Sequence, residues 1–62
     1  MSNINEILNI LFAFRLGLPV VWKDYYGSWW EVRNNHIFDF HSEYRVVYND
    51  IDVKDYLKML NE

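Results

Sequence analysis

The stretch VVWKDYYGSWWEVR, residues 20–33, decides the fold of this chain. Both of its ends are rich in β-branched and aromatic residues, which favour strands, and the sequence Tyr-Gly-Ser at 26–28 favours a turn. The pattern predicts a strand over residues 20–25, a tight turn, and a return strand over residues 29–33. We therefore expect an antiparallel hairpin at the centre of the fold.

The residues before the hairpin predict a helix over residues 3–16. Ser2 or Asn3 is expected to cap its start, and Gly17 is expected to end it in a left-handed conformation, with a proline soon after. Apolar side chains recur at the i, i+3, i+4, i+7 spacing of one helical face. These side chains are Ile4, Ile7, Leu8 and Leu11.

The residues after the hairpin complete the predicted architecture. Residues 36–41 alternate around two phenylalanines and predict either a short strand or an extended loop that plugs the core. Residues 44–48 predict a further strand, and residues 52–60 predict a helix that Asn49 or Asp50 would cap. The expected fold class is α+β in a single domain over the whole chain. It is a small three- to four-stranded antiparallel meander flanked by an N-terminal and a C-terminal helix.

The composition limits the chemistry that this chain can carry. Its 62 residues hold no cysteine, which removes disulfides, iron–sulfur clusters and thiolate zinc sites. Two glycines are too few for a Rossmann fingerprint or a P-loop, and no Gly-x-Ser-x-Gly elbow is present. His36 and His41 would point to opposite faces of an extended strand, which disfavours a shared metal. We therefore predict no catalytic residue, no cofactor and no metal site, and we do not expect an enzyme.

Charge and hydropathy indicate the compartment and exclude some partners. The formal net charge of -3 argues against broad binding of a phosphate backbone. The apolar stretch over residues 7–21 is interrupted by Asn9, Arg15, Gly17 and Pro19, and is too short to span a bilayer. No export signal is apparent at the start of the chain. The cytoplasm is the expected location, without a membrane.

The aromatic residues predict a binding surface. They make up 19% of the chain, and the helices are expected to cover only one face of the sheet. The other face would then expose aromatic and charged side chains together, as interfaces do. Because a domain of this size is marginally stable, a homo-oligomer is also expected. The candidate binding surface consists of Trp22, Tyr25, Trp29, Glu31, Arg33 and Arg45.

Four short runs resemble a pattern of small uncharacterised tailed-phage proteins. The runs are GLPVVW (17–22), GSWWEV (27–32), FDF (38–40) and YRV (44–46). In that pattern a helix precedes G-x-W, F-x-F and Y-R-[VI] segments. The resemblance covers residues 7–47, and this chain departs from it in the helical tail that starts at Asp52. It implies an early phage protein that acts by binding, and it identifies no site residues.

The leading hypothesis is a phage-type, host-directed or anti-defence inhibitor that acts by occlusion or sequestration. Its partner would be a host protein or a small nucleotide ligand. One alternative is a nucleic-acid-binding accessory protein, with bases stacked on Trp22 and Trp29 and phosphates on Arg33 and Arg45. A second alternative is a structural or assembly component of a virion, which packs only against copies of itself.

Overall fold

The computed structural model describes residues 4–39, 41–48 and 50–62. In chain order its elements are helix α1 (Ile4–Arg15), strands β1 (Val20–Lys23), β2 (Trp29–Glu31) and β3 (Glu43–Val46), and helix α2 (Val53–Asn61). All strand pairs are antiparallel. The predicted α+β class, with a helix near each end of a small sheet, is therefore confirmed.

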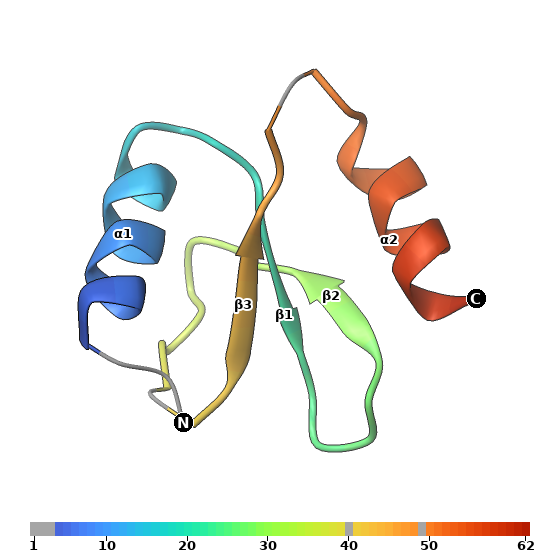
Figure 1. Ribbon diagram of the computed structural model, residues 1–62, viewed down its shortest axis with the longest axis horizontal. Coiled ribbons are helices and arrows are strands. Elements are labelled where there is room, and N and C mark those ends of the chain that lie inside the picture. The colour runs from blue at the N-terminus through green and yellow to red at the C-terminus, as the bar shows by residue number, and fades with distance from the viewer. Residues whose placement is uncertain (1–3, 40, 49) are drawn as a thin grey trace.

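The strand order is β2-β1-β3, with the first strand in the centre (Figure 1). A sequential meander would place β2 in the centre, so this part of the prediction is wrong. After β2 the chain crosses to the far side of β1, and residues 32–42 provide the length for that crossing. Within the described part of this segment no strand forms, so of the two alternatives for residues 36–41 the loop is the one observed.

The end of α1 follows the prediction. Gly17 has a φ of 90°, which only glycine adopts at low cost. Leu18 N donates to Ala13 O at 3.1 Å and Gly17 N donates to Phe14 O at 3.1 Å. These two bonds form a Schellman motif, which satisfies the last carbonyl groups of the helix. The predicted caps at its start, Ser2 and Asn3, lie outside the described residues.

The start of α2 differs from the prediction. Asp52 is the N-cap, and its carboxylate accepts from Lys54 N at 2.8 Å and from Asp55 N at 3.4 Å. Asp50, one of the two predicted caps, instead has a φ of 59° and turns the chain two residues earlier. The prediction is wrong for Asp50 because an N-cap needs an extended backbone directly before the first helical turn. Asn49 lies outside the described residues.

The two helices lie on opposite faces of the sheet (Figure 1). The register places Val21 beside Glu31 and Arg45 on one face, and Trp22 beside Trp30 and Tyr44 on the other. On the first face, α2 packs Val53, Tyr56, Leu57 and Leu60 against Val21, Trp29 and Val47. Helix α1 contacts β3 and β1 on the second face. The expectation that the helices cover only one face is therefore wrong.

Candidate functional site

The two tryptophans of the predicted binding surface are covered. Trp29 is only 6% exposed, and the Arg45 guanidinium lies 4.9 Å from the centre of its ring. Trp22 is half-buried on the opposite face, with the His36 ring 5.0 Å away. Because each face of the sheet has its own cover, neither indole presents an open stacking platform. The expectation that one face of the sheet would expose Trp29 or Trp22 is therefore wrong.

The other four predicted residues are exposed, but the six residues do not form one continuous surface. Tyr25 lies in the turn between β1 and β2 and is 96% exposed. Glu31 and Arg45 lie on the two outer strands, on either side of Val21. Arg33 follows β2. The six residues are therefore divided between two faces and a turn.

Asp24 organises the turn of the hairpin. Its Oδ1 accepts from Tyr26 N and from Ser28 N, both at 2.9 Å. Its Oδ2 accepts from the indole Nε1 of Trp30 at 2.7 Å. These bonds, first that of Trp30 and then that of Ser28, lower the pKa of the Asp24 carboxyl below its ordinary value of 3.8. One carboxylate thus fixes both the turn and an indole ring.

The hairpin tip, which we define as Tyr25, Tyr26 and Trp30, is the exposed aromatic surface that sequence reasoning only partly found. Tyr26 is 88% and Trp30 54% exposed, and the two tyrosine rings meet edge to face at 5.5 Å. Alternation along the strand shows that Trp29 and Trp30 oppose each other, but not which one is covered. The sequence feature that could have indicated Trp30 is the acidic residue at position 24, because a carboxylate there can bond both the turn and a nearby indole.

The loop before β3 is fastened by Tyr44. Asp39 N donates to Tyr44 Oη at 3.0 Å, and Tyr44 Oη lies 2.8 Å from His36 Nε2. The hydroxyl of Tyr44 thus joins the loop backbone to the imidazole, and burial lowers the pKa of His36. Phe38 packs beside Tyr44 and Phe14, at ring distances of 5.2 and 5.6 Å. This cluster supports the start of β3.

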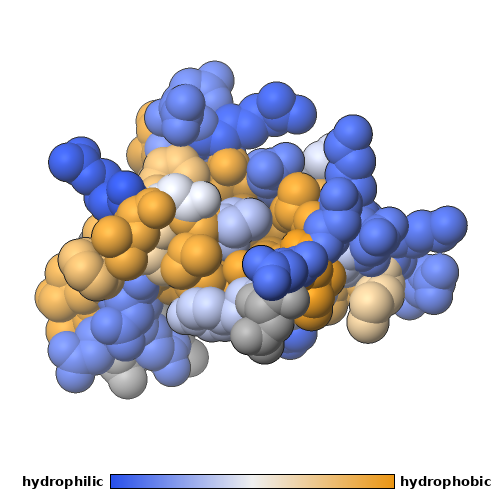
Figure 2. Space-filling model, turned by 90° about the horizontal axis from the view of Figure 1, so that it is seen from above, coloured by the Kyte–Doolittle hydropathy of each residue, from blue (hydrophilic) through white to orange (hydrophobic). Residues whose placement is uncertain are grey.

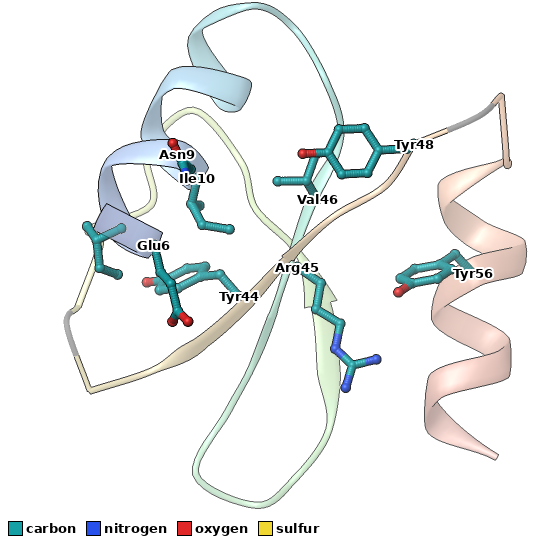
Figure 3. Close-up of a pocket in the computed structure, with 9 residues that line it drawn as sticks. Glu6, Asn9, Ile10, Tyr44, Arg45, Val46, Tyr48 and Tyr56 are labelled. Carbon is teal, nitrogen blue, oxygen red and sulfur yellow. The ribbon is translucent and has the colours of Figure 1, made fainter. Parts of the chain in front are cut away.

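A groove runs along the outer edge of β3, with α1 on one side and α2 on the other (Figure 3). We call it the edge groove; its volume is about 460 Å³. In Figure 3, Tyr44 and Val46 extend toward α1, whereas Arg45 extends toward the α2 side. The lining residues are Glu6, Ile7, Asn9 and Ile10 of α1, Tyr44, Arg45, Val46 and Tyr48 of β3 and its continuation, and Tyr56 of α2.

The backbone of β3 that faces the edge groove is open. Val47 N donates to Pro19 O at 2.8 Å, so the residues that bond to β1 are those at odd positions, 43, 45 and 47. Alternate residues of an antiparallel strand direct their backbone groups to opposite sides. The N–H and C=O groups of Tyr44 and Val46 therefore point away from β1. They have no partner within residues 4–39, 41–48 and 50–62.

The outer edge of β2 is treated differently. Trp29 N donates to Asn61 Oδ1 at 2.8 Å, and Asn61 Nδ2 donates to Trp29 O at 3.1 Å. The side-chain amide of α2 thus makes the pair of bonds that a neighbouring strand would make. On this side the sheet is closed where Trp29 lies.

Helix α1 carries a row of exposed apolar side chains on its outer face. They follow one i, i+4 row and are between 55% and 67% exposed. Figure 2 shows hydrophobic side chains concentrated toward the side of the molecule on which α1 lies. We call this row the α1 ridge, and it consists of Ile4, Leu8, Phe12 and Leu16.

Comparison of the chain with protein families, with curated protein sequences and with solved structures finds no match. Within the described residues, no helix is long and apolar enough to cross a membrane. The same part of the chain contains no group of three or more His, Asp or Glu residues placed to hold a metal ion. The candidate site therefore consists of three surfaces: the hairpin tip, the edge groove and the α1 ridge.

Proposed function

We propose that this protein is a binding protein that acts by occluding a partner protein, which it contacts through the hairpin tip. The observation that carries the proposal is the exposed indole of Trp30, which the Asp24 carboxylate holds in place beside two exposed tyrosines. Tryptophan and tyrosine dominate the energetic centres of protein interfaces. A ring that is already fixed loses little conformational freedom on binding, which favours affinity.

The burial of Trp22 and Trp29 and the charge beside Trp30 favour a protein over a nucleic acid as the partner. Single-stranded nucleic acids need exposed ring faces next to a cationic groove. Trp22 and Trp29, on which that alternative relied, are covered, and Arg45 lies over Trp29. The charge nearest to Trp30 is the Asp24 carboxylate, which repels phosphate. Only the resemblance to small phage proteins favours a host protein, and an anti-defence role, for the partner.

The α1 ridge supports self-association as a second part of the proposal. Four large apolar residues on one i, i+4 row form the kind of ridge that packs into the grooves of another helix at about −50°. Two copies can bury this row against each other in a two-fold dimer. The same surface would serve the alternative of a virion component that packs against its own copies.

Affinity capture with matched variants tests the proposed function. Tagged protein is incubated with host lysate and then cross-linked, as wild type, as Trp30→Ala, and as Ile37→Ala, in which an exposed apolar residue outside the tip is lost. We expect one host protein to be captured by the wild type and by Ile37→Ala, and lost with Trp30→Ala. Equal capture by all three variants contradicts a role for the tip.

Three solution measurements test the remaining hypotheses. A thermal shift with a cyclic or ADP-ribose-type nucleotide would favour sequestration of a nucleotide signal. Tryptophan quenching by single-stranded DNA that weakens with salt would favour the nucleic-acid alternative.

Light scattering of wild type and Phe12→Asp at tens of micromolar tests self-association: we expect a dimer for the wild type and a monomer for the variant. A monomeric wild type contradicts the role of the α1 ridge.

A further inference from the structure

We propose that the edge groove accepts an extended segment of another polypeptide as a fourth strand beside β3, and that it selects the pattern apolar–acidic–apolar. This site is separate from the hairpin tip, because its lining comes from α1, β3 and α2 and includes no residue of the turn. The inference therefore stands or fails independently of the proposed function.

The backbone of β3 supplies the first part of the argument. Tyr44 and Val46 present two N–H and two C=O groups to the groove, at the spacing that an added antiparallel strand requires. Such addition to a free sheet edge is a common mode of peptide recognition, in which main-chain bonds give affinity and side-chain pockets give specificity. At the other edge, Asn61 already occupies the backbone groups of Trp29. The sheet is therefore open to a strand at β3.

The two sides of the groove supply the sequence pattern. Directly opposed residues of an antiparallel pair share one face of the sheet. Residues opposite Tyr44 and Val46 would face the α1 side, where Ile7 and Ile10 line the groove, so apolar side chains fit there. The residue between them would lie opposite Arg45, on the α2 side, so an acidic side chain fits there.

Arg45 is placed to receive that acidic group. Its side chain is half-exposed, and its NH2 nitrogen lies 3.6 Å from the Glu43 carboxylate. The guanidinium has five N–H donors, so one long contact leaves donors for a second carboxylate. The guanidinium lies 4.9 Å from the centre of the Trp29 ring, which keeps it on the α2 face of the sheet. The hydroxyphenyl group of Tyr56 lines the same side.

The dimensions favour a single short segment over a second copy of this chain. Strand β3 has four residues, about 13 Å at the rise of a β-strand, and the groove volume is about 460 Å³. Helices line the groove on both sides of the strand. A second β3 would bring its own α1 and α2 against them, whereas an isolated extended segment brings only its side chains.

A peptide titration of the full-length protein tests the proposal. The probe is the acetylated and amidated peptide Lys-Thr-Val-Glu-Val-Thr-Lys, added to ¹⁵N-labelled protein and followed by NMR. We expect saturable shifts of the Tyr44 and Val46 amides, with slower hydrogen exchange at both. A peptide that carries Lys in place of Glu should bind about fivefold or more weakly, because an attractive cross-strand pair becomes repulsive. Methylation of the two Val amide nitrogens should weaken binding about tenfold or more.

Matched protein variants separate specificity from stability. Arg45→Gln should remove the preference for Glu over Gln in the peptide, while Arg33→Gln, an exposed arginine outside the groove, should keep it. Because Arg45 also packs on Trp29, the Glu-to-Gln change is made in the peptide with wild-type protein as well. The proposal is overturned if no saturable shift occurs at millimolar peptide, or if amide methylation has no effect. It is also overturned if Tyr44 and Val46 become protected with protein concentration alone, since a second copy would then occupy the groove.

Discussion

The two outer edges of the sheet show opposite solutions to the same problem. An edge strand exposes unpaired backbone groups that invite another strand, and most proteins block them. At β2, the amide of Asn61 takes both backbone groups of Trp29, while the apolar face of α2 covers the indole. At β3, the corresponding groups of Tyr44 and Val46 face a groove. A single polar residue in the last turn of α2 therefore closes the β2 edge at Trp29.

The adjacent tryptophans of β2 repeat this contrast on a smaller scale. Trp29 points toward α2 and is almost fully buried, whereas Trp30 points to the other face and is half-exposed. Trp29 is held by packing and by Asn61 through its backbone, and Trp30 by one bond from its indole to Asp24. The first residue serves stability, and we propose that the second serves binding.

The largest expected effect follows from Trp29→Ala. Loss of a buried indole lowers the free energy of unfolding by about 3–5 kcal/mol, which is close to the whole stability of a domain this small. We expect the variant to be largely unfolded at 25 °C, as measured by far-UV circular dichroism and urea denaturation. Trp30→Ala is the matched control and should lose less than half as much. Equal losses in the two variants would remove the distinction between them.

The second effect tests the closure of the β2 edge by Asn61. Asn61→Ala leaves the N–H and C=O groups of Trp29 without their partner and should lower the free energy of unfolding by about 1–2 kcal/mol. Hydrogen exchange of the Trp29 amide should accelerate beyond what this loss of global stability explains. Asn35→Ala, in the exposed loop after β2, is the control and should change neither quantity. A Trp29 amide that remains protected in Asn61→Ala would mean that something else closes this edge.

The fold, including the closed edge at β2, could be predicted from the sequence only in part. The helices and the hairpin follow from local signals: an apolar i, i+4 spacing, a glycine at the end of α1, and β-rich residues around a turn. The strand order does not, because residues 44–48 carry no local preference for β1 over β2 as a neighbour. The role of Asn61 also depends on a contact that spans 32 positions in the sequence.

The candidate site was predicted less well than the fold, for a related reason. Period-2 alternation assigns Trp22 and Trp29 to opposite faces, but the identity of the covering element is set by tertiary packing. The prediction assumed that the helices cover only one face, and this assumption led to the expectation that either Trp22 or Trp29 would be exposed. Tyr25 was expected at the surface and is exposed, whereas Trp30, which was not among the predicted residues, is 54% exposed.

A third prediction concerns the Asp24 carboxylate, whose hydrogen bonds hold the hairpin tip. The pKa of Asp24 is lowered in the folded state, so its contribution to stability is present above the ordinary value of 3.8 and is lost as pH falls through the lower folded value. Asp24→Asn keeps an oxygen for the turn amides but offers no second acceptor to the indole of Trp30. In wild type, the Trp30 Nε1–H resonance should move as pH falls below about 4. In Asp24→Asn it should be shifted at neutral pH and insensitive to this titration.

The smallest expected effect is on the pH dependence of stability. It concerns His36, in the loop that Tyr44 links to β3. Burial lowers the pKa of His36 below its ordinary value of 6.5, so the unfolded chain binds more protons as pH falls through that value. The stability from the neutral imidazole is therefore present above pH 6.5 and decreases as pH falls below it, because the buried ring must take up a proton. We expect the melting temperature of wild type to fall in this lower pH range and that of His36→Phe to fall less, because phenylalanine keeps the ring contacts with Trp22 and Phe38 without the titration. His41→Phe replaces the other histidine of the loop and should retain the wild-type dependence. If His36→Phe and wild type lose stability in parallel, the support of β3 does not depend on the neutral imidazole.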